Sequence, residues 1–402
     1  MKRKSIWLVL SLIVLLVVSG CGNKSTPTSS DPGASGDVKT VNIGYTGPLS
    51  GGGALFGKDV TEGLDLAVDE INAKGLLVNG EKYKINLIKL DDQYMPDKAA
   101  TNARRLRTEF ETPVIFVPHS GGAFALQQFN ETDEFLIMAY TSEGKVAKTG
   151  NKLTVQMTTP YSLYPEVYSK KVMDKFGKKL ALIPTSSQYG KDWSEAVIPA
   201  WEKLGGTIVA NNPVDYNKEV DFNTYVSKAL AANPDVLFVG GPSQPTAMVI
   251  KQARQLGFKG GFILMDQAKV EQMEGVIPLT DLEGAVCLTP VYLYDSPGAK
   301  PFVERFKAKY NGKVPAWESS KNYDNMMLLA KGIEKAGNVT DAAKILEGMR
   351  AVTPFNDPTI TAHIPGIAEG GGSMTPGTGI MIENGQYGKQ FSIPNPADTT
   401  KK

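Results

Sequence analysis

The sequence predicts an α/β fold with two doubly wound, parallel-sheet lobes that are joined by a hinge. Short apolar strands alternate with amphipathic helices from residue 41 onward, and the same alternation starts again at residue 180. Strands that are apolar along nearly their whole length are typical of a parallel sheet that helices cover on both faces. The length of 402 residues is sufficient for two hydrophobic cores, so the two runs predict two lobes of similar construction.

The chain begins with the layout of a secretory signal peptide. Three basic residues precede an apolar run over residues 6–18, which one serine interrupts. The run is too short to span a bilayer comfortably, so we expect a signal peptide over residues 1–20. It ends in Val-Ser-Gly-Cys21, which resembles the bacterial lipoprotein box. The resemblance implies cleavage before Cys21, lipid on that cysteine, and a protein anchored to the cell membrane on its extracellular or periplasmic side. The alternative is an uncleaved amphipathic anchor.

The composition excludes several classes of site. Residues 21–37 are rich in Ser, Thr, Pro and Gly and are predicted to form a flexible tether. If lipid occupies Cys21, Cys287 has no partner for a disulfide, and two histidines are too few for a three-histidine zinc site. The formal net charge is +1, which gives no basic surface for nucleic acid. We therefore expect no metal, no cofactor and no nucleic-acid partner.

The first run of elements is read from its apolar periodicity. In the helix over residues 57–74, apolar side chains recur at steps of three and four, and Gly75 is expected to end it. The predicted strands cover residues 41–45, 84–90, 113–117 and 135–139, and the other helices cover 97–110 and 123 to about 131.

The second run repeats the order of strand and helix. Its predicted strands cover residues 180–183, 207–210, 235–239 and 261–265, with helices over 192–204, 222–232 and 246–256 between them. Three helices follow over residues 299–310, 319–336 and 341–349, and a weak strand pattern occurs at 378–382. Asp192 is expected to cap the helix that begins there.

Two turns form the candidate binding site. Residues 118–122 and 140–143 follow two adjacent buried strands, and ligands of open α/β sheets bind beyond the carboxyl ends of the strands. Gly121 and Gly122 are expected to leave backbone N–H groups uncovered at a helix start, where a carboxylate or phosphate is attracted. Two roles stay open for His119, a polar role at the rim of the pocket and simple structural hydrogen bonding.

The glycine-rich turn after the first strand falls short of a nucleotide-binding motif. Gly52, Gly57 and Lys58 fit the G-x-x-x-x-G-K pattern, but Asp59 stands where Ser or Thr would hold magnesium. We interpret this turn as a structural loop that approaches a ligand or the other lobe. The sequence also has no G-x-S-x-G elbow and no H-E-x-x-H motif, so we expect no enzymatic activity.

Eight short segments between about residues 41 and 350 carry a family resemblance. They are residues 43–51, 56–57, 70–75, 91–92, 188–190, 221–222, 251–257 and 323–324. In this order they resemble the solute-binding proteins of branched-chain amino acid ABC transporters. The resemblance implies a type I periplasmic binding protein fold with the ligand between two lobes. It implies an N-terminal lobe of residues 38–159 plus about 290–375, and a C-terminal lobe of residues 160–289 plus about 376–397.

The resemblance also implies which residues line the pocket. The solute carboxylate would meet Ser120 with Gly121 and Gly122, and the next turn would contribute Thr141 and Glu143. The second lobe would contribute Tyr189 and, for the solute ammonium, Asp266, while Phe56 forms an aromatic wall. One lobe would thus supply anion donors and the other an anion, and aromatic rings would cover the apolar body of the solute.

The chain departs from the family pattern at several of these positions. Pro242 replaces a tyrosine, Glu143 adds a negative charge, and the family's disulfide positions fall on Tyr94 and His119. The first expectation is a monomeric receptor for a branched-chain or related amino acid, with an ABC transporter permease as its partner. The alternatives are an aromatic carboxylate as solute, and a ligand sensor in place of a transport component.

Overall fold

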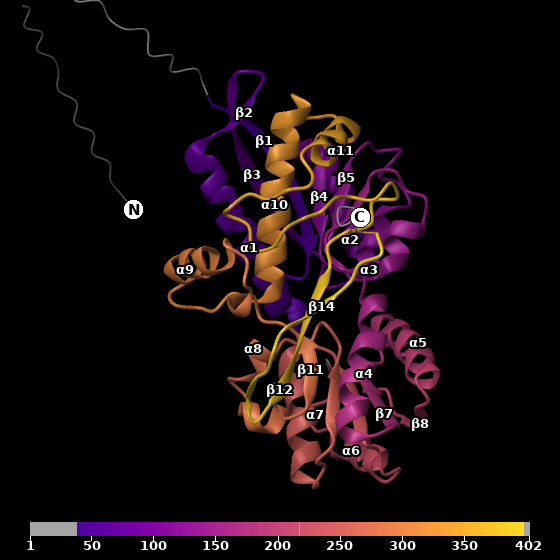
Figure 1. Ribbon diagram of the computed structural model, residues 1–402. Helices are drawn as coiled ribbons and strands as arrows, with labels where there is room; N and C mark the ends of the chain where they lie inside the picture. Colours follow the sequence, from indigo (N-terminus) through magenta and orange to yellow (C-terminus); the bar gives the residue numbers. More distant parts are fainter. Residues whose placement is uncertain (1–37, 217, 398–402) are drawn as a thin grey trace, which may run out of the picture. The chain divides into compact units, whose positions relative to one another are not determined.

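The computed structural model describes residues 38–216 and 218–397 (Figure 1). The predicted signal peptide, the tether and the lipid-anchor residue Cys21 lie outside the described residues. Within those residues, none of the helices combines the length and the apolar character that a membrane crossing requires.

A six-stranded sheet forms the first of two lobes. Its strand order is β2-β3-β1-β4-β5-β6, and all neighbours are parallel except β2, which is antiparallel to β3. The strands are β1 Lys39–Gly47, β2 Leu76–Val78, β3 Glu81–Asp91, β4 Val114–Val117, β5 Leu136–Ala139 and β6 Thr154–Gln156. Because β3 and β4 lie on opposite sides of β1, the winding direction changes between β1 and β4. That change of direction marks the sheet edge where ligands of this fold class bind.

A second sheet forms the second lobe. Its order is β13-β12-β11-β10-β9-β7-β8, with β14 paired to β12. The strands are β7 Lys179–Pro184, β8 Thr207–Asn211, β9 Val236–Gly240, β10 Gly261–Leu264, β11 Ala285–Leu288, β12 Gly377–Glu383, β13 Gln386–Tyr387 and β14 Phe391–Ile393. Strands β7 to β11 are parallel, and β12 is antiparallel to β11. The predicted two-lobe α/β fold is confirmed.

Helices cover both sheets. The first lobe contains α1 Ala54–Lys74, α2 Pro96–Phe110, α3 Ser120–Leu126, α10 Trp317–Ala336 and α11 Ala342–Ala351, with α9 Ala299–Lys309 against α10. The second lobe contains α4 Tyr164–Phe176, α5 Gln188–Lys203, α6 Asn223–Leu230, α7 Ser243–Gln255 and α8 Val270–Met273. Short 3₁₀ helices are η1 Gly51–Gly53, η2 Gly144–Lys148, η3 Tyr161–Leu163, η4 Leu279–Leu282 and η5 Val291–Leu293. Figure 1 shows α10 lying beside α1, although more than 240 residues separate their starts.

Most predicted elements are present, with shifted ends. The helix predicted over residues 192–204 begins at Gln188, so the prediction that Asp192 caps it is wrong. Ser187 is the capping residue, because its side chain accepts a hydrogen bond from the amide of Gly190. Helix α4 had no prediction, since only one of its five buried residues, Val172, is an aliphatic residue of the kind that the periodicity search relies on; the others are Tyr164, Pro165, Tyr168 and Ser169.

Candidate functional site

The turn after β4 is organised by His119. Its Nδ1 accepts a hydrogen bond from the amide of Gly122 at 2.9 Å, so Nε2 carries the ring proton and donates to Asp92 at 3.0 Å. The ring also stacks on Tyr94, with centroids 4.8 Å apart. This geometry is that of structural hydrogen bonding, the second of the two roles considered for His119.

The capping interaction corrects one detail of the predicted anion site. The amide of Gly122 was expected to be uncovered, but the His119 ring occupies it. A Cβ at Gly122 would lie 2.6 Å from Val117 and 2.7 Å from His119, so this glycine is needed for close packing. The half-buried Ser120 and Gly121 begin α3, and the amides of a helix's first residues have no partner within the helix.

The polar side chains in the turn after β5 also form hydrogen bonds within the protein. Glu143 is 1% exposed, and its carboxylate accepts hydrogen bonds from the amide of Lys145 at 2.8 Å and the hydroxyl of Tyr161 at 3.0 Å. Burial raises the pKa of the Glu143 carboxyl above its usual value. Thr141 accepts a hydrogen bond from the amide of Glu143 at 3.1 Å. Glu143 thus caps η2 within this turn, and the neighbouring Ser142 faces the second lobe.

Ser142 begins a hydrogen-bond chain between the two lobes. Its Oγ lies 2.5 Å from the phenolic oxygen of Tyr189, and the Tyr189 hydroxyl donates to the carboxylate of Asp266. Because Tyr189 has a single hydroxyl proton, Ser142 must be the donor in the first bond. Asp266 is 5% exposed and also accepts from the indole Nε1 of Trp193 at 3.3 Å. The structure therefore brings Asp266 and Tyr189 together with the turn that contains Thr141. Sequence reasoning missed Ser142, which differs in no local pattern from other loop serines.

Phe56, which was predicted to form an aromatic wall of the pocket, lies in a row of aromatic rings. Its ring lies 6.0 Å from Tyr94 and 6.1 Å from Tyr140, and Tyr140 lies 6.1 Å from Trp317, all measured between centroids. Tyr140 is the first residue of the turn after β5, and Trp317 begins α10. These rings are the kind of surface that covers an apolar solute body.

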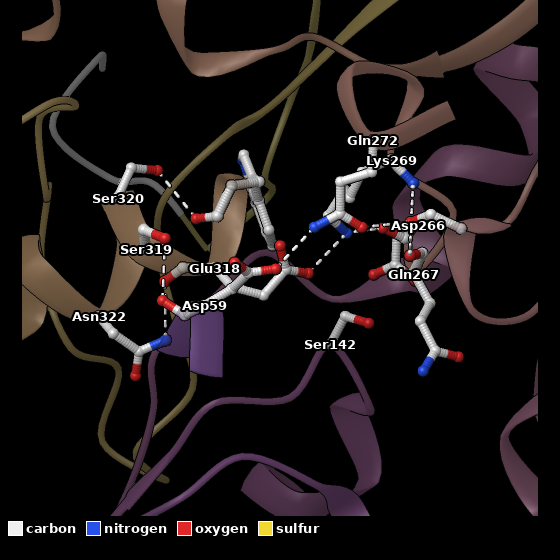
Figure 2. Close-up of polar contacts among 12 residues, drawn as sticks. Asp59, Ser142, Asp266, Gln267, Lys269, Gln272, Glu318, Ser319, Ser320 and Asn322 are labelled. Atoms are coloured by element: carbon white, nitrogen blue, oxygen red, sulfur yellow. Dashed lines mark hydrogen bonds and ion pairs between the residues drawn. The ribbon is translucent and has the colours of Figure 1, made fainter. Parts of the chain in front are cut away.

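Polar contacts from α8 and from Lys269, the residue before it, reach α1 and α10 beside this wall (Figure 2). Gln272 donates to Asp59 at 2.6 Å, and Lys269 pairs with Glu318 at 3.1 Å. Asp59 also pairs with Lys313 at 2.6 Å, and burial raises the pKa of Asp59 to about 6. Asp59, the residue that departs from the nucleotide-binding motif, therefore has its partners within the protein.

The glycine-rich turn itself has a steric explanation. A Cβ at Gly57 would lie 1.5 Å from the carbonyl oxygen of Pro48, so only glycine permits this approach. A surface hollow of 340 Å³ lies beside the turn, but it shares none of its lining residues with the predicted site. In the described ranges, no group of three or more His, Cys, Asp and Glu side chains is arranged to hold a metal ion.

The two-lobe fold, together with the family that residues 40–384 match, defines a solute-binding protein and not an enzyme. Residues 40–384 match the family model described as periplasmic binding protein, and the chain belongs to this family. The resemblance to the solute-binding proteins of branched-chain amino acid transporters is thereby confirmed at the level of the family.

Individual relatives match most of the chain at modest identity. An amino acid binding protein of Pseudomonas aeruginosa is 27% identical over 347 residues, which cover 84% of this chain and 87% of the relative. Leu/Ile/Val-binding protein homolog 7 of Brucella suis is 29% identical over 341 residues, covering 79% of this chain and 82% of the relative. The crystal structure of a leucine binding protein from Thermotoga maritima has a TM-score of 0.75 and 26% identity, covering 89% of this chain and 99% of that structure.

Proposed function

We propose that this protein is the solute receptor of an ABC importer and that it binds a branched-chain or related amino acid between its two lobes. The observation that carries the proposal is the buried carboxylate of Asp266, which Tyr189 and Trp193 orient at the carboxyl end of β10. A carboxylate offers about four acceptor positions, so two remain for the ammonium group of a solute.

The opposite lobe supplies the complementary group. The first amides of α3, at Ser120 and Gly121, would donate to the solute carboxylate, and Thr141 would contribute its hydroxyl. The wall that begins at Phe56 would cover an apolar side chain. This arrangement favours a zwitterion with an apolar body, which agrees with the leucine, isoleucine and valine in the names of the relatives.

Closure of the lobes would create the surface that the permease recognises. We place the N-terminal lobe at residues 38–159 with about 290–375, and the C-terminal lobe at 160–289 with about 376–397. Helix α10 lies between β11 and β12 in the sequence, but it packs on α1 of the first lobe. This arrangement supports a discontinuous N-terminal lobe. Lipid on Cys21 would keep the receptor, as a monomer, at the outer face of the membrane.

Thermal unfolding in the presence of single solutes tests the proposal. We expect millimolar L-leucine, L-isoleucine or L-valine to raise the unfolding temperature by several degrees, because 100-fold excess over Kd stabilises by about 2.7 kcal/mol. D-leucine is the matched control, since it has the same groups in the wrong arrangement. An unfolding temperature that none of the L-amino acids changes would contradict this class of solute.

An aromatic carboxylate is the second candidate, and the run of rings from Tyr94 to Trp317 favours it. A benzoate-type acid has a carboxylate and an apolar body but no ammonium for Asp266. Stabilisation by benzoate and not by the amino acids would select this candidate. Uptake into vesicles that contain the cognate permease would then separate transport from sensing.

A further inference from the structure

We infer that Lys269 is a positioning residue whose buried ion pair with Glu318 holds the two lobes in their closed arrangement. The inference rests on the proposed function, because closure around a solute is what such a pair would serve. Lys269 follows β10 of the second lobe, and Glu318 lies in the first turn of α10 in the first lobe. The two charged groups are 3.1 Å apart, and each side chain is only 3% exposed.

The ammonium group of Lys269 also contacts the proposed solute site. Lys269 Nζ donates to the main-chain carbonyl oxygen of Asp266 and lies 5.2 Å from the centroid of the Trp317 ring (Figure 2 shows the first contact). One cation therefore joins the backbone of the predicted ammonium-binding residue to a helix of the opposite lobe. Loss of Glu318 as a partner would release this connection between solute binding and closure.

A second contact between the lobes begins three residues further along the chain. Gln272 Nε2 donates to Asp59 of α1 at 2.6 Å. Its amide is oriented by Ser243, which accepts from the backbone amide of Lys269 at 3.0 Å and donates its hydroxyl proton to Gln272 Oε1 at 2.6 Å. The segment from Lys269 to Gln272 thus reaches α10 and α1 together, as Figure 2 shows.

Lys269 is needed to compensate the buried carboxylates at this contact only when the lobes are closed. Glu318 Oε2 and Glu271 Oε1 are buried without a hydrogen-bond partner among the described residues, and Glu271 interacts electrostatically with both Lys269 and Glu318. When the lobes separate, water can hydrate each of these groups. Closing removes that water, and the ion pair compensates the loss only while both partners are present.

Single and double substitutions of this ion pair should affect the closed arrangement differently. Lys269→Met leaves Glu318 as an uncompensated charge in the closed arrangement, and Glu318→Gln does the same for Lys269. The double variant removes both charges, and replacement of a whole buried pair is often nearly neutral. If the two side chains acted independently of each other, the losses of the single variants would instead add up in the double variant.

Hydrogen exchange of two segments, residues 265–273 and 316–322, measures the pair directly. The purified protein and the three variants are compared without solute and with L-leucine, L-isoleucine and L-valine, and each Kd is measured by calorimetry. We expect both single variants to exchange faster in both segments and to bind about tenfold or more weakly, since affinity scales with the population of the competent state. The double variant should return to within about threefold of the wild-type affinity.

Lys89→Met is the matched control. It breaks an ion pair with Asp65 at 2.8 Å, which joins β3 to α1 and does not involve the second lobe. It should change neither segment. The inference is overturned if the single variants exchange like the wild type with and without solute, or if the double variant loses the product of the single losses. If no amino acid binds the wild type, the proposed solute class fails, while exchange in the solute-free proteins still decides the role of Lys269.

Discussion

The hydroxyl oxygen of Ser142 lies 2.5 Å from the phenolic oxygen of Tyr189, although the two residues belong to different lobes. The Tyr189 hydroxyl in turn donates a hydrogen bond to the carboxylate of Asp266. The turn after β5 is thus connected, through the Tyr189 hydroxyl, to the carboxylate that we assign to the solute ammonium. Closure and the orientation of Asp266 are therefore linked through one tyrosine hydroxyl.

Replacing Asp266 with alanine should separate the two candidate solutes. We expect Asp266→Ala to weaken binding of an amino acid severely, by about 100-fold or more, because the loss of a charged partner costs about 3 kcal/mol. Binding of an aromatic acid without an ammonium should be unaffected. Calorimetry with L-leucine and benzoate measures both, and Trp193→Phe, which removes one 3.3 Å hydrogen bond without a charge, is the control. Equal losses for both solutes would show that burial and not charge recognition determines affinity.

A double-mutant cycle on Ser142 and Tyr189 tests the connection between the lobes. Tyr189→Phe removes a donor to Asp266 and an acceptor for Ser142, so it should weaken solute binding by about tenfold, or about 1.4 kcal/mol. Ser142→Ala should cost less, and it should cost nothing further in the Tyr189→Phe background. Additive losses in calorimetry would mean that the two hydroxyls act independently.

The sequence was informative wherever structure depends on neighbouring residues. Strands such as β4 and β5 are continuous apolar runs, and their positions and the turns after them could be predicted. Asp266 and Tyr189 were identified only through their place in the family pattern, and their mutual contact confirms that they are neighbours.

Long-range contacts explain what could not be predicted. No periodicity relates Lys269 to Glu318, because their pairing depends on how α8 and α10 come together. Likewise, the family resemblance assigned Glu143 to the pocket, and its carboxylate accepts a hydrogen bond from Tyr161, which follows β6, a strand that was not predicted. Which of the turn residues faces the other lobe depends on these side-chain partners.

Arg254 should stabilise the second lobe without affecting solute binding. Its guanidinium donates to four main-chain carbonyl oxygens at 2.6–3.0 Å, those of Phe258, Gly260, Asp281 and Glu283. Arg254→Met leaves these carbonyls without a donor and should cost about 3 kcal/mol, since each hydrogen bond to a charged group contributes about 1.5–3 kcal/mol but they are not independent. Chemical denaturation should show this loss, whereas the Kd for L-leucine should stay within about twofold. Arg254→Lys should rescue little, because an ammonium group cannot reproduce the planar fork.

The free energy of unfolding should decrease as the pH rises from about 4.5 to 7, because Glu271, at the contact between the lobes, titrates in this range. Burial raises the pKa of Glu271 to about 7, from an ordinary value of 4.5. The protonated carboxyl is therefore favoured in the folded protein, which binds more protons than the unfolded chain between these two values. The contribution is fully present below pH 4.5 and is lost as the pH rises through 7.

Glu271→Gln isolates this contribution, because the amide resembles the protonated carboxyl and does not titrate. We expect the variant to be more stable than the wild type at pH 8 and to differ little from it at pH 4.5, as measured by urea denaturation across that range. Asp324→Asn is a useful comparison, since burial raises the pKa of Asp324 to about 6 and its carboxylate accepts two hydrogen bonds from Thr361. A stability difference between wild type and Glu271→Gln that stays constant from pH 4.5 to 8 would contradict the assignment, because only a group that titrates differently in the two states can make it vary.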